Sequence, residues 1–422
     1  MYRVSYGKKT ISFDIPKNFS IDTVDTKKTP TIDNVYEKTQ KSLMNPINSA
    51  SLPDLIKGKK TACIVVTDIT RKCPDKDLLV PILEILEKEI PKENITILIA
   101  SGMHKKMSNN EKIEKYGKTI CDSYEIIDHN ANDDNSLVFL GNTKNGNPVK
   151  LSKFAIDADF LISLGVVEPH QFAGYSGGFK TISIGIADDY TISRTHSIKN
   201  IKKSKIKVGQ INQNPIYDEI IDIGKKSGLN FIVNVILSNN NEVLEIQSGE
   251  PVETHKNLIK KITQLYRIPL KKSYDVVICG VGYPRDSNLY QATRAASYLY
   301  FIEKPIINHG GYIIIPAPCT EGAGMGVGEQ RFFTTLKNKT IDEILNINEE
   351  LKAGEQRSYF IAQVLKYCKI IIVGSKKPEI IKEAKMISVK DMNEAFNIIK
   401  QNFKNAEILL IPNVLSSLPK IE

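Results

Sequence analysis

The hydrophobic positions along the chain follow two different periods. Around Gly7, residues 2–6 and 10–14 alternate between apolar and polar, which predicts a β-hairpin. Residues 77–89 place apolar side chains three and four positions apart, which predicts an amphipathic helix, as does the pattern of residues 341–352. Short apolar runs bounded by turn residues predict strands at 61–67, 95–100, 124–128, 160–165, 231–237, 275–279, 311–316, 369–373 and 408–412.

Strands that alternate with helices in this way predict an α/β fold with two α/β domains, largely parallel sheets and an active-site cleft between the domains. Two domains are expected because 422 residues exceed the ~250–300 at which single cores stop growing. We place the boundary near residue 270, where the charged pair Lys271-Lys272 precedes a new βα unit. The prediction is an N-terminal domain of residues 1–270, rejoined by 404–422, and a C-terminal domain of residues 271–403.

Composition places the chain among ordinary globular proteins, with 41% hydrophobic and 25% charged residues. The net charge of +9 comes from lysines spread along the chain without interleaved aromatic residues, so we expect no nucleic-acid surface. No segment approaches the ~20 apolar residues of a membrane span, and the first residues contain no apolar signal core. Six cysteines without a CxxC pair are typical of reduced thiols, so the expected location is the cytoplasm.

The residues directly after predicted strands are candidates for chemistry, because ligands bind beyond the carboxyl ends of strands in open α/β sheets. The run 68–71 follows the first strand of the series, and its aspartate, threonine and arginine suit an anion or a ribose. His104 follows a Ser-Gly turn after the next strand and can exchange a proton near neutral pH. Ordinary surface turns would also explain both segments.

The glycine-rich loop at residues 165–180 is the richest of these segments. Its glycines resemble a phosphate cradle, but their spacing before Lys180 does not match the loop of nucleoside triphosphatases. His170 and Lys180 lie on either side of the glycines, and His196 follows on the next predicted helix. The chain has six histidines, and three of them (His104, His170 and His196) lie in these segments. That concentration favours a shared site.

A second set of candidates lies in the predicted C-terminal domain, in a loop that runs from a strand into a helix. The glycines at 280 and 282 are a weak dinucleotide signal, because Pro284 interrupts the motif. Helical spacing puts Tyr290 and Gln291 on the same face as Arg294, a suitable shape for holding a carboxylate. An ordinary charged helix would explain the same residues.

Taken in order, these segments resemble the nickel-pincer lactate racemase family. The residues that carry the resemblance are Asp68-Ile69-Thr70-Arg71, Ser101-Gly102-Met103-His104, Glu168-Pro169-His170, Gly177-Gly178-Phe179-Lys180, Thr195-His196-Ser197 and Tyr290-Gln291-Ala292-Thr293-Arg294. The likeness runs from about residue 60 to residue 300 in a fixed order, which makes the set specific although each motif alone is weak.

The resemblance implies a cofactor and a role for each residue. The cofactor is a nickel-pincer nucleotide, pyridinium-3,5-bisthiocarboxylic acid mononucleotide with nickel, which other, cofactor-synthesis proteins must build. Four ligands of the implied type favour square-planar nickel. The implied roles are Lys180 as the covalent tether, His196 as a nickel ligand, His104 and His170 as the two bases, Asp68, Ile69, Thr70, Arg71, Gly177 and Gly178 near the nucleotide, and Arg71, Tyr290, Gln291 and Arg294 at the substrate.

The implied activity is a racemase or epimerase of small 2-hydroxy acids. Removing a proton from C2 of such an acid would create a strongly unfavourable dianion, whereas moving a hydride to an electron-poor pyridinium avoids it. One histidine takes the hydroxyl proton as the hydride leaves, and the other histidine serves the opposite face. Because lactate-racemising members carry lysine at the position of Arg294, the substrate stays open between lactate, another short 2-hydroxy acid, a hydroxy diacid such as malate, and a sugar acid.

Two other interpretations use the same residues. The first is a zinc hydrolase in which His104, His170 and His196 hold the metal. The second is a non-catalytic binding protein for a phosphorylated ligand, held by the glycine-rich loop. The second interpretation gives no reason for two histidines that can transfer protons.

Overall fold

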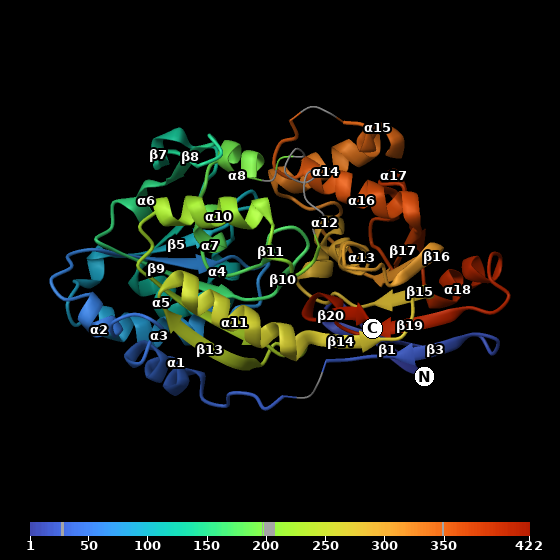
Figure 1. The fold of residues 1–422 in the computed structure, drawn as a ribbon, viewed down its shortest axis with the longest axis horizontal. Coiled ribbons are helices and arrows are strands. Elements are labelled where there is room, and N and C mark those ends of the chain that lie inside the picture. The colour runs from blue at the N-terminus through green and yellow to red at the C-terminus, as the bar shows by residue number, and fades with distance from the viewer. Residues whose placement is uncertain (27–28, 196, 198–206, 348–349) are drawn as a thin grey trace.

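The computed structural model describes residues 1–26, 29–195, 197, 207–347 and 350–422. Two six-stranded sheets, in which all but one of the strands run in parallel, form the framework, and helices cover both of them (Figure 1). This arrangement confirms the predicted α/β fold with largely parallel sheets. None of the described helices is long and apolar enough to cross a membrane.

The first sheet has the strand order β13-β12-β9-β4-β5-β6. All its neighbours pair in parallel except β13, which runs antiparallel to β12. Every residue of β4, β9 and β12 is buried, which is typical of parallel strands with helices on both faces. The strands are β4 (Ala62–Thr67), β5 (Ile95–Ala100), β6 (Glu125–Asp128), β9 (Phe160–Val166), β12 (Phe231–Leu237) and β13 (Val243–Gly249).

Separate hydrophobic clusters fill the two faces of this sheet. One face packs against α1 (Val35–Met44), α2 (Leu52–Leu55), α3 (Asp75–Leu86), α4 (Asn109–Tyr116) and α5 (Lys118–Ser123). The other face packs against α6 (Lys153–Ile156), α7 (Lys180–Ser183), α8 (Asp189–Thr195) and α10 (Pro215–Lys226). Nearby lie α11 (Pro251–Tyr266), the hairpin of β7 (Leu137–Asn142) and β8 (Pro148–Ser152), and the small pair of β10 (Pro169–His170) and β11 (Gly174–Tyr175).

The second sheet is parallel throughout, with the order β18-β17-β16-β15-β19-β3. Its strands are β3 (Ser20–Thr23), β15 (Tyr274–Cys279), β16 (Ile307–Pro316), β17 (Lys369–Val373), β18 (Ile387–Val389) and β19 (Glu407–Ile411). One face packs against α12 (Leu289–Ala292), α13 (Arg294–Tyr300), α14 (Val327–Asn338), α15 (Ile341–Leu345), α16 (Glu355–Tyr367) and α17 (Pro378–Glu383). The other face packs against α18 (Met392–Lys400) and the hairpin of β1 (Tyr2–Tyr6) and β2 (Lys9–Phe13).

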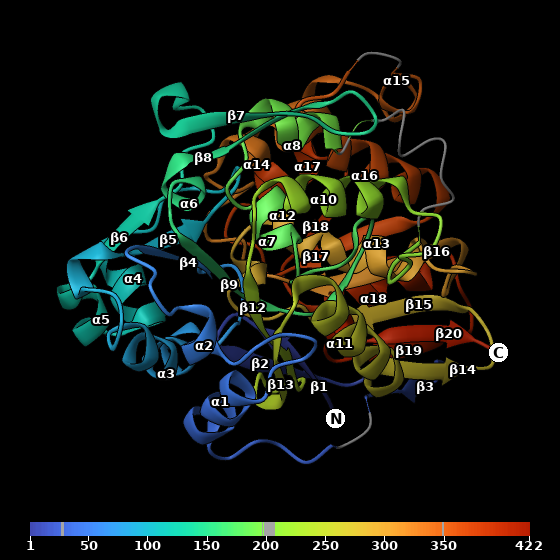
Figure 2. The same cartoon turned by 60° about the vertical axis from the view of Figure 1, so that its left-hand side comes forward.

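The chain ends differ from the prediction. The C-terminal run was predicted to rejoin the first sheet, but β19 pairs with β15 in the second sheet, and β3 from the N-terminal segment pairs with β19 (Figure 1). The sequence could not decide this, because β19 is apolar on both faces and its residues enter both cores of the second sheet. The last strand, β20 (Leu418–Ile421), pairs with β14 (Arg267–Leu270), and the two lie near the C-terminus in Figure 2. In Figure 1 this pair lies between the two halves. The boundary near residue 270 stays a prediction.

The predicted helix at 341–352 is also shorter than expected, since α15 ends at Leu345. The helix begins at Ile341, as predicted, and Thr340 and Glu343 form a capping box at its start. Asn346, which follows α15, has a non-helical backbone and closes the last turn with its N–H on the carbonyl of Asp342. The helical spacing of apolar residues therefore continued beyond the helix itself.

Candidate active site

One cavity lies between the two halves of the molecule, at the carboxyl ends of β4, β5 and β9, whose last residues Thr67, Ala100 and Val166 line it. It collects residues that are far apart in the sequence. Of the residues predicted for the site, those that line the cavity are Arg71, His104, His170, Gly177, Lys180, Tyr290, Gln291 and Arg294. The α12–α13 segment of the second half therefore faces the glycine-rich loop of the first half.

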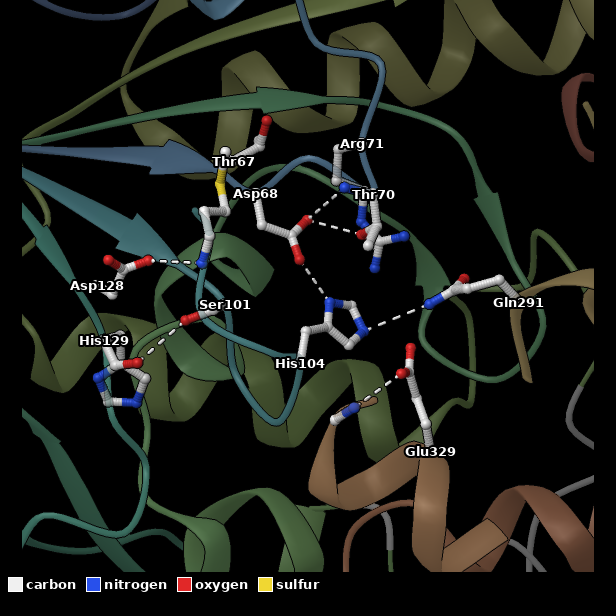
Figure 3. Close-up of polar contacts among 12 residues, drawn as sticks. Thr67, Asp68, Thr70, Arg71, Ser101, His104, Asp128, His129, Gln291 and Glu329 are labelled. Carbon is white, nitrogen blue, oxygen red and sulfur yellow. Dashed lines mark hydrogen bonds and ion pairs between the residues drawn. The ribbon is translucent and has the colours of Figure 1, made fainter. Parts of the chain in front are cut away.

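His104 is held by a buried carboxylate (Figure 3). Its Nδ1 lies 2.5 Å from Oδ2 of Asp68, and Oδ1 of Asp68 accepts hydrogen bonds from the backbone N–H and the hydroxyl of Thr70. Burial alone would raise the pKa of Asp68, but the charge and hydrogen bond of His104, together with Arg71, lower it to about 2. Asp68 is therefore ionised at neutral pH and accepts the Nδ1 proton of His104.

This pairing decides which nitrogen of His104 can act on a ligand. With the proton on Nδ1, the lone pair of the neutral ring lies on Nε2. Nε2 lies 3.4 Å from the side-chain amide nitrogen of Gln291, on the side of the ring away from Asp68 (Figure 3). His104 thus presents a proton acceptor toward the residues of α12.

His170 is held in a different way. It lies in the tight β10–β11 pair, is 7% exposed, and its Nδ1 accepts a hydrogen bond of 3.1 Å from the backbone N–H of Ala173. In the neutral ring this contact places the proton on Nε2. The ring packs edge-on against Phe172, at 4.5 Å between centroids. His170 thus presents a proton donor, where His104 presents an acceptor.

Lys180 begins α7 directly after the glycine-rich loop, and its side chain lines the cavity. Burial lowers its pKa to about 7, and the nearby charges of Arg71 and Arg294 act in the same direction. A large fraction of the amine is therefore neutral at physiological pH, which an ordinary lysine is not. Such an amine is suited to forming a covalent bond with an electrophilic carbon.

The glycines before Lys180 are required by close packing. Gly177 has φ +77°, and a Cβ there would lie 2.6 Å from Oδ1 of Asn234. Gly178 has φ +53°, its N–H donates to Asn234 at 2.7 Å, and a Cβ there would meet the ring of His255. The loop is thereby pressed against β12, and Gly177 lines the cavity.

Buried polar atoms around the cavity lack partners within the described part of the chain. They include guanidinium nitrogens of Arg71, Arg294 and Arg357 and side-chain oxygens of Gln171, Gln291 and Gln356. An unpaired buried donor or acceptor costs roughly 1–3 kcal/mol, and a charged one costs more. The guanidinium nitrogens suit an anionic group of a ligand, whereas the amide oxygens suit groups that donate hydrogen bonds, such as hydroxyls.

Arg294 is aimed by Tyr298, one turn further along α13. Its Nη2 donates to the hydroxyl of Tyr298 at 3.0 Å, and that hydroxyl in turn donates to the carbonyl of Pro169, next to His170. Its other nitrogen, Nη1, is among the unpartnered atoms. Tyr298 thus links the guanidinium of Arg294 to the loop that carries His170.

An ion pair joins the loops of the two halves beside the cavity. Nη2 of Arg285 lies 2.5 Å from Oε2 of Glu168, with exposures of only 4% and 6%. Although burial would raise the pKa of Glu168, Arg285 lowers it. Both residues stand in loops that the sequence marked for chemistry, but the spacing of 117 residues between them gave no sign that they pair.

Several predicted site residues do not line this cavity. Asp68, Ile69 and Thr70 lie behind His104 and line a smaller neighbouring cavity, and the N–H of Gly178 is committed to Asn234. The predicted metal ligand His196 lies outside the described residues. It follows α8, whose Ile192 lines the main cavity. No group of three or more histidine, cysteine or acidic residues suited to a metal occurs within the described ranges.

Sequence reasoning missed other residues of the cavity. Gln171, Glu329, Gln356 and Arg357 line it together with the predicted set. Gln171 follows His170 directly and was a detectable neighbour. Glu329 lies in the first turn of α14, directly after a segment that follows β16 and contains Gly322, Gly324, Gly326 and Gly328, so a glycine-rich signal was present but was not used. Gln356 and Arg357 lie in the first turn of α16, in a segment that has the composition of an ordinary surface helix.

Comparison with known proteins gives matches along the whole chain. The family described as the lactate racemase N-terminal domain matches residues 6–209, and the lactate racemase C-terminal domain matches residues 270–418. A lactate racemase from Thermoanaerobacterium thermosaccharolyticum is 30% identical over 420 residues, covering 98% of this chain and 97% of the relative. A lactate racemase from Lactiplantibacillus plantarum is 30% identical over 392 residues, 91% of each chain.

Solved structures agree with these matches. The apoprotein of the lactate racemase from Thermoanaerobacterium thermosaccharolyticum superposes with a TM-score of 0.85 at 28% identity and covers 99% of both chains. A protein from Thermotoga maritima superposes with a TM-score of 0.68 at 17% identity, over 93% of this chain and 100% of its own. The second likeness shows a shared fold.

Proposed function

The chain belongs to the lactate racemase family, a family of isomerases, and from that membership we propose that it racemises or epimerises a short 2-hydroxy acid. The observation that carries the proposal is that His104 and His170 line one cavity together with Lys180. A racemase needs a proton-transferring group for each face of the reacting carbon, whereas a one-handed dehydrogenase needs only one. A zinc hydrolase or a non-catalytic binding protein would not account for the family membership.

We propose that the cofactor is the nickel-pincer nucleotide, joined covalently to Lys180. Three features of the cavity fit such a group: the largely neutral amine of Lys180, the unpartnered Nη1 of Arg71, and the close backbone approach at Gly177. His196, outside the described residues, is the proposed nickel ligand. When bound, the cofactor supplies reversible hydride acceptance from C2 of the substrate.

The histidines would handle the hydroxyl proton. Nε2 of His104 accepts it in one direction, and Asp68 keeps the ring in the tautomer that makes this possible. Nε2 of His170 delivers the proton on the opposite face. Delivery from a neutral ring would leave an imidazolate anion, so His170 must also carry a proton on Nδ1, both as the acid in this direction and as the base in the reverse direction, and must release its contact with the N–H of Ala173. The two histidines thus both transfer the hydroxyl proton, but a carboxylate holds the ring of His104 and a backbone N–H holds the ring of His170.

The substrate carboxylate is assigned to the second half of the cavity. Arg294 offers an unpartnered guanidinium nitrogen, and Tyr290 and Gln291 lie beside it on the same short helical segment. A planar guanidinium forms two parallel hydrogen bonds with a carboxylate, which fixes the orientation of C2 as well as its position.

We further propose that the protein is located in the cytoplasm and that its activity depends on the proteins that synthesise the cofactor.

The proposal is tested by chiral chromatography of pure D- and L-2-hydroxy acids incubated with cofactor-loaded enzyme. The panel contains lactate, malate and a sugar acid, and the unloaded chain is the control. At least one acid should be converted toward the racemic or epimeric mixture from both starting enantiomers, by the loaded enzyme alone. No conversion of any acid by enzyme whose nickel content and mass show full loading would refute the proposed function.

A further inference from the structure

The cavity contains more positive charge than a monocarboxylic substrate uses. Among the described residues that line it, the cations are Arg71, Lys180, Arg294 and Arg357, and the one carboxylate is Glu329. That carboxylate already accepts hydrogen bonds from the N–H of Gly326 at 2.9 Å and from Asn288 at 3.4 Å. Within the described part of the chain, none of the three arginines forms an ion pair, and the carboxylates of Asp68, Glu168 and Glu329 act on them only from beyond ion-pair distance.

Arg357 is the least expected of these cations. It lies in the first turn of α16 and is 3% exposed. Its guanidinium lies over the ring of Tyr290, at 4.6 Å from the centroid, and Nη2 donates to the hydroxyl of Thr293 at 3.4 Å. These contacts tie Arg357 to the α12–α13 segment that carries Arg294, while its Nε has no partner.

The surplus of charge can be assigned by matching cations to anions. Lys180 loses its charge once it is joined to the cofactor through an amide-like bond. Of the three arginines, we assign Arg71, which the resemblance places near both the nucleotide and the substrate, to the phosphate of the proposed nucleotide, and Arg294 to the carboxylate at C1 of the substrate. Arg357 is left without an anion at ion-pair distance: Glu329 acts on it only from further away, and a buried guanidinium that lacks a close counter-charge is strongly unfavourable.

We propose that the substrate carries a second carboxylate, bound by Arg357, so that the substrate class is short 2-hydroxy dicarboxylic acids. This inference rests on the proposed racemase function and narrows it. The planar guanidinium can donate two parallel hydrogen bonds to a second carboxylate of the substrate. The methyl group of lactate and the neutral hydroxyl of a sugar acid cannot accept such a pair of bonds or balance the charge.

The test compares kcat/KM of the loaded enzyme for two diacids, malate and 2-hydroxyglutarate, with that for the monoacid lactate. The wild type should prefer one of the diacids by about 10²-fold or more, the scale of a desolvated charge pair. Arg357→Gln should reduce this preference to near unity, and Arg357→Lys should restore part of it. Arg267→Gln, at an exposed arginine paired with Glu422, is the control and should leave the preference unchanged.

Melting temperature and intact mass are measured for every variant, so that misfolding and loss of cofactor are recognised. Turnover of lactate or of a sugar acid as fast as the best diacid overturns the inference and leaves the proposed function standing. Loss of the cofactor adduct in folded Arg357→Gln and Arg357→Lys would assign Arg357 to the cofactor, and this also overturns the inference. If Arg357→Gln does not fold, wild-type selectivity and Arg357→Lys decide. Failure to convert any acid refutes the proposed function itself.

Discussion

Replacing Lys180 with alanine should abolish both covalent attachment of the cofactor and racemisation, down to the limit of detection. Burial and the nearby arginines lower the pKa of Lys180 to about 7, so about half of this amine is neutral at pH 7. For an ordinary lysine the neutral fraction at that pH is roughly 1 in 10³. Intact mass and peptide mapping of loaded wild type and variant measure the attachment.

Lys256→Ala provides the control, because Lys256 is an exposed lysine that pairs only with Glu253 among the described residues. This variant should keep the adduct and the activity.

An independent experiment uses the unloaded chain. The rate at which acetic anhydride acetylates Lys180 should rise with pH, with a midpoint near pH 7, since only the neutral amine reacts and its fraction increases as the pH passes the pKa. An adduct that maps to another lysine, or that persists in Lys180→Ala, would contradict the assignment.

Removing either His104 or His170 should cripple racemisation in both directions. Every turnover takes the hydroxyl proton on one face and delivers it on the other, so each turnover uses both histidines. General acid–base groups typically contribute ~10²–10⁴-fold, and the losses for His104→Ala and His170→Ala should reach at least that range. The measurement is the initial rate from pure D- and from pure L-substrate.

A half-reaction distinguishes the two histidines. Each single variant should still transfer hydride from one enantiomer and then stop at the keto acid, so single-turnover absorbance changes should show opposite enantiomeric preferences. His309→Gln, at an exposed histidine on β16, is the control and should behave as wild type. Near wild-type racemisation by either alanine variant would show that its histidine is not a base.

The framework of the fold was predictable because parallel strands covered on both faces form apolar runs that stand out in a sequence. The strands β5, β12 and β17 have the predicted position, and the cavity lies where strand ends meet. Which sheet a buried run joins depends on partners that the run itself does not encode. That is why β19 was assigned to the first sheet, although it pairs with β15 in the second.

The candidate site was predictable to the extent that its residues follow strands or glycines. His104, His170 and Lys180 met that condition, and the cavity brings them together. Pairings across the fold were not predictable: Asp68 holds His104 from 36 positions away. Arg357 lies in an unremarkable charged helix start, and only the packing of α16 against α13 and α14 brings it to the cavity.

The fate of the hydrogen at C2 distinguishes hydride transfer from removal of a proton from carbon. Loaded enzyme is incubated in ordinary water with one enantiomer of a converted 2-hydroxy acid that carries deuterium at C2, and the opposite enantiomer is isolated and analysed by mass spectrometry. The product should keep its deuterium, because the hydride returns to the same carbon without exchanging with water. Product that carries solvent hydrogen at C2 would show that a proton is removed from carbon, and this would contradict the proposed mechanism.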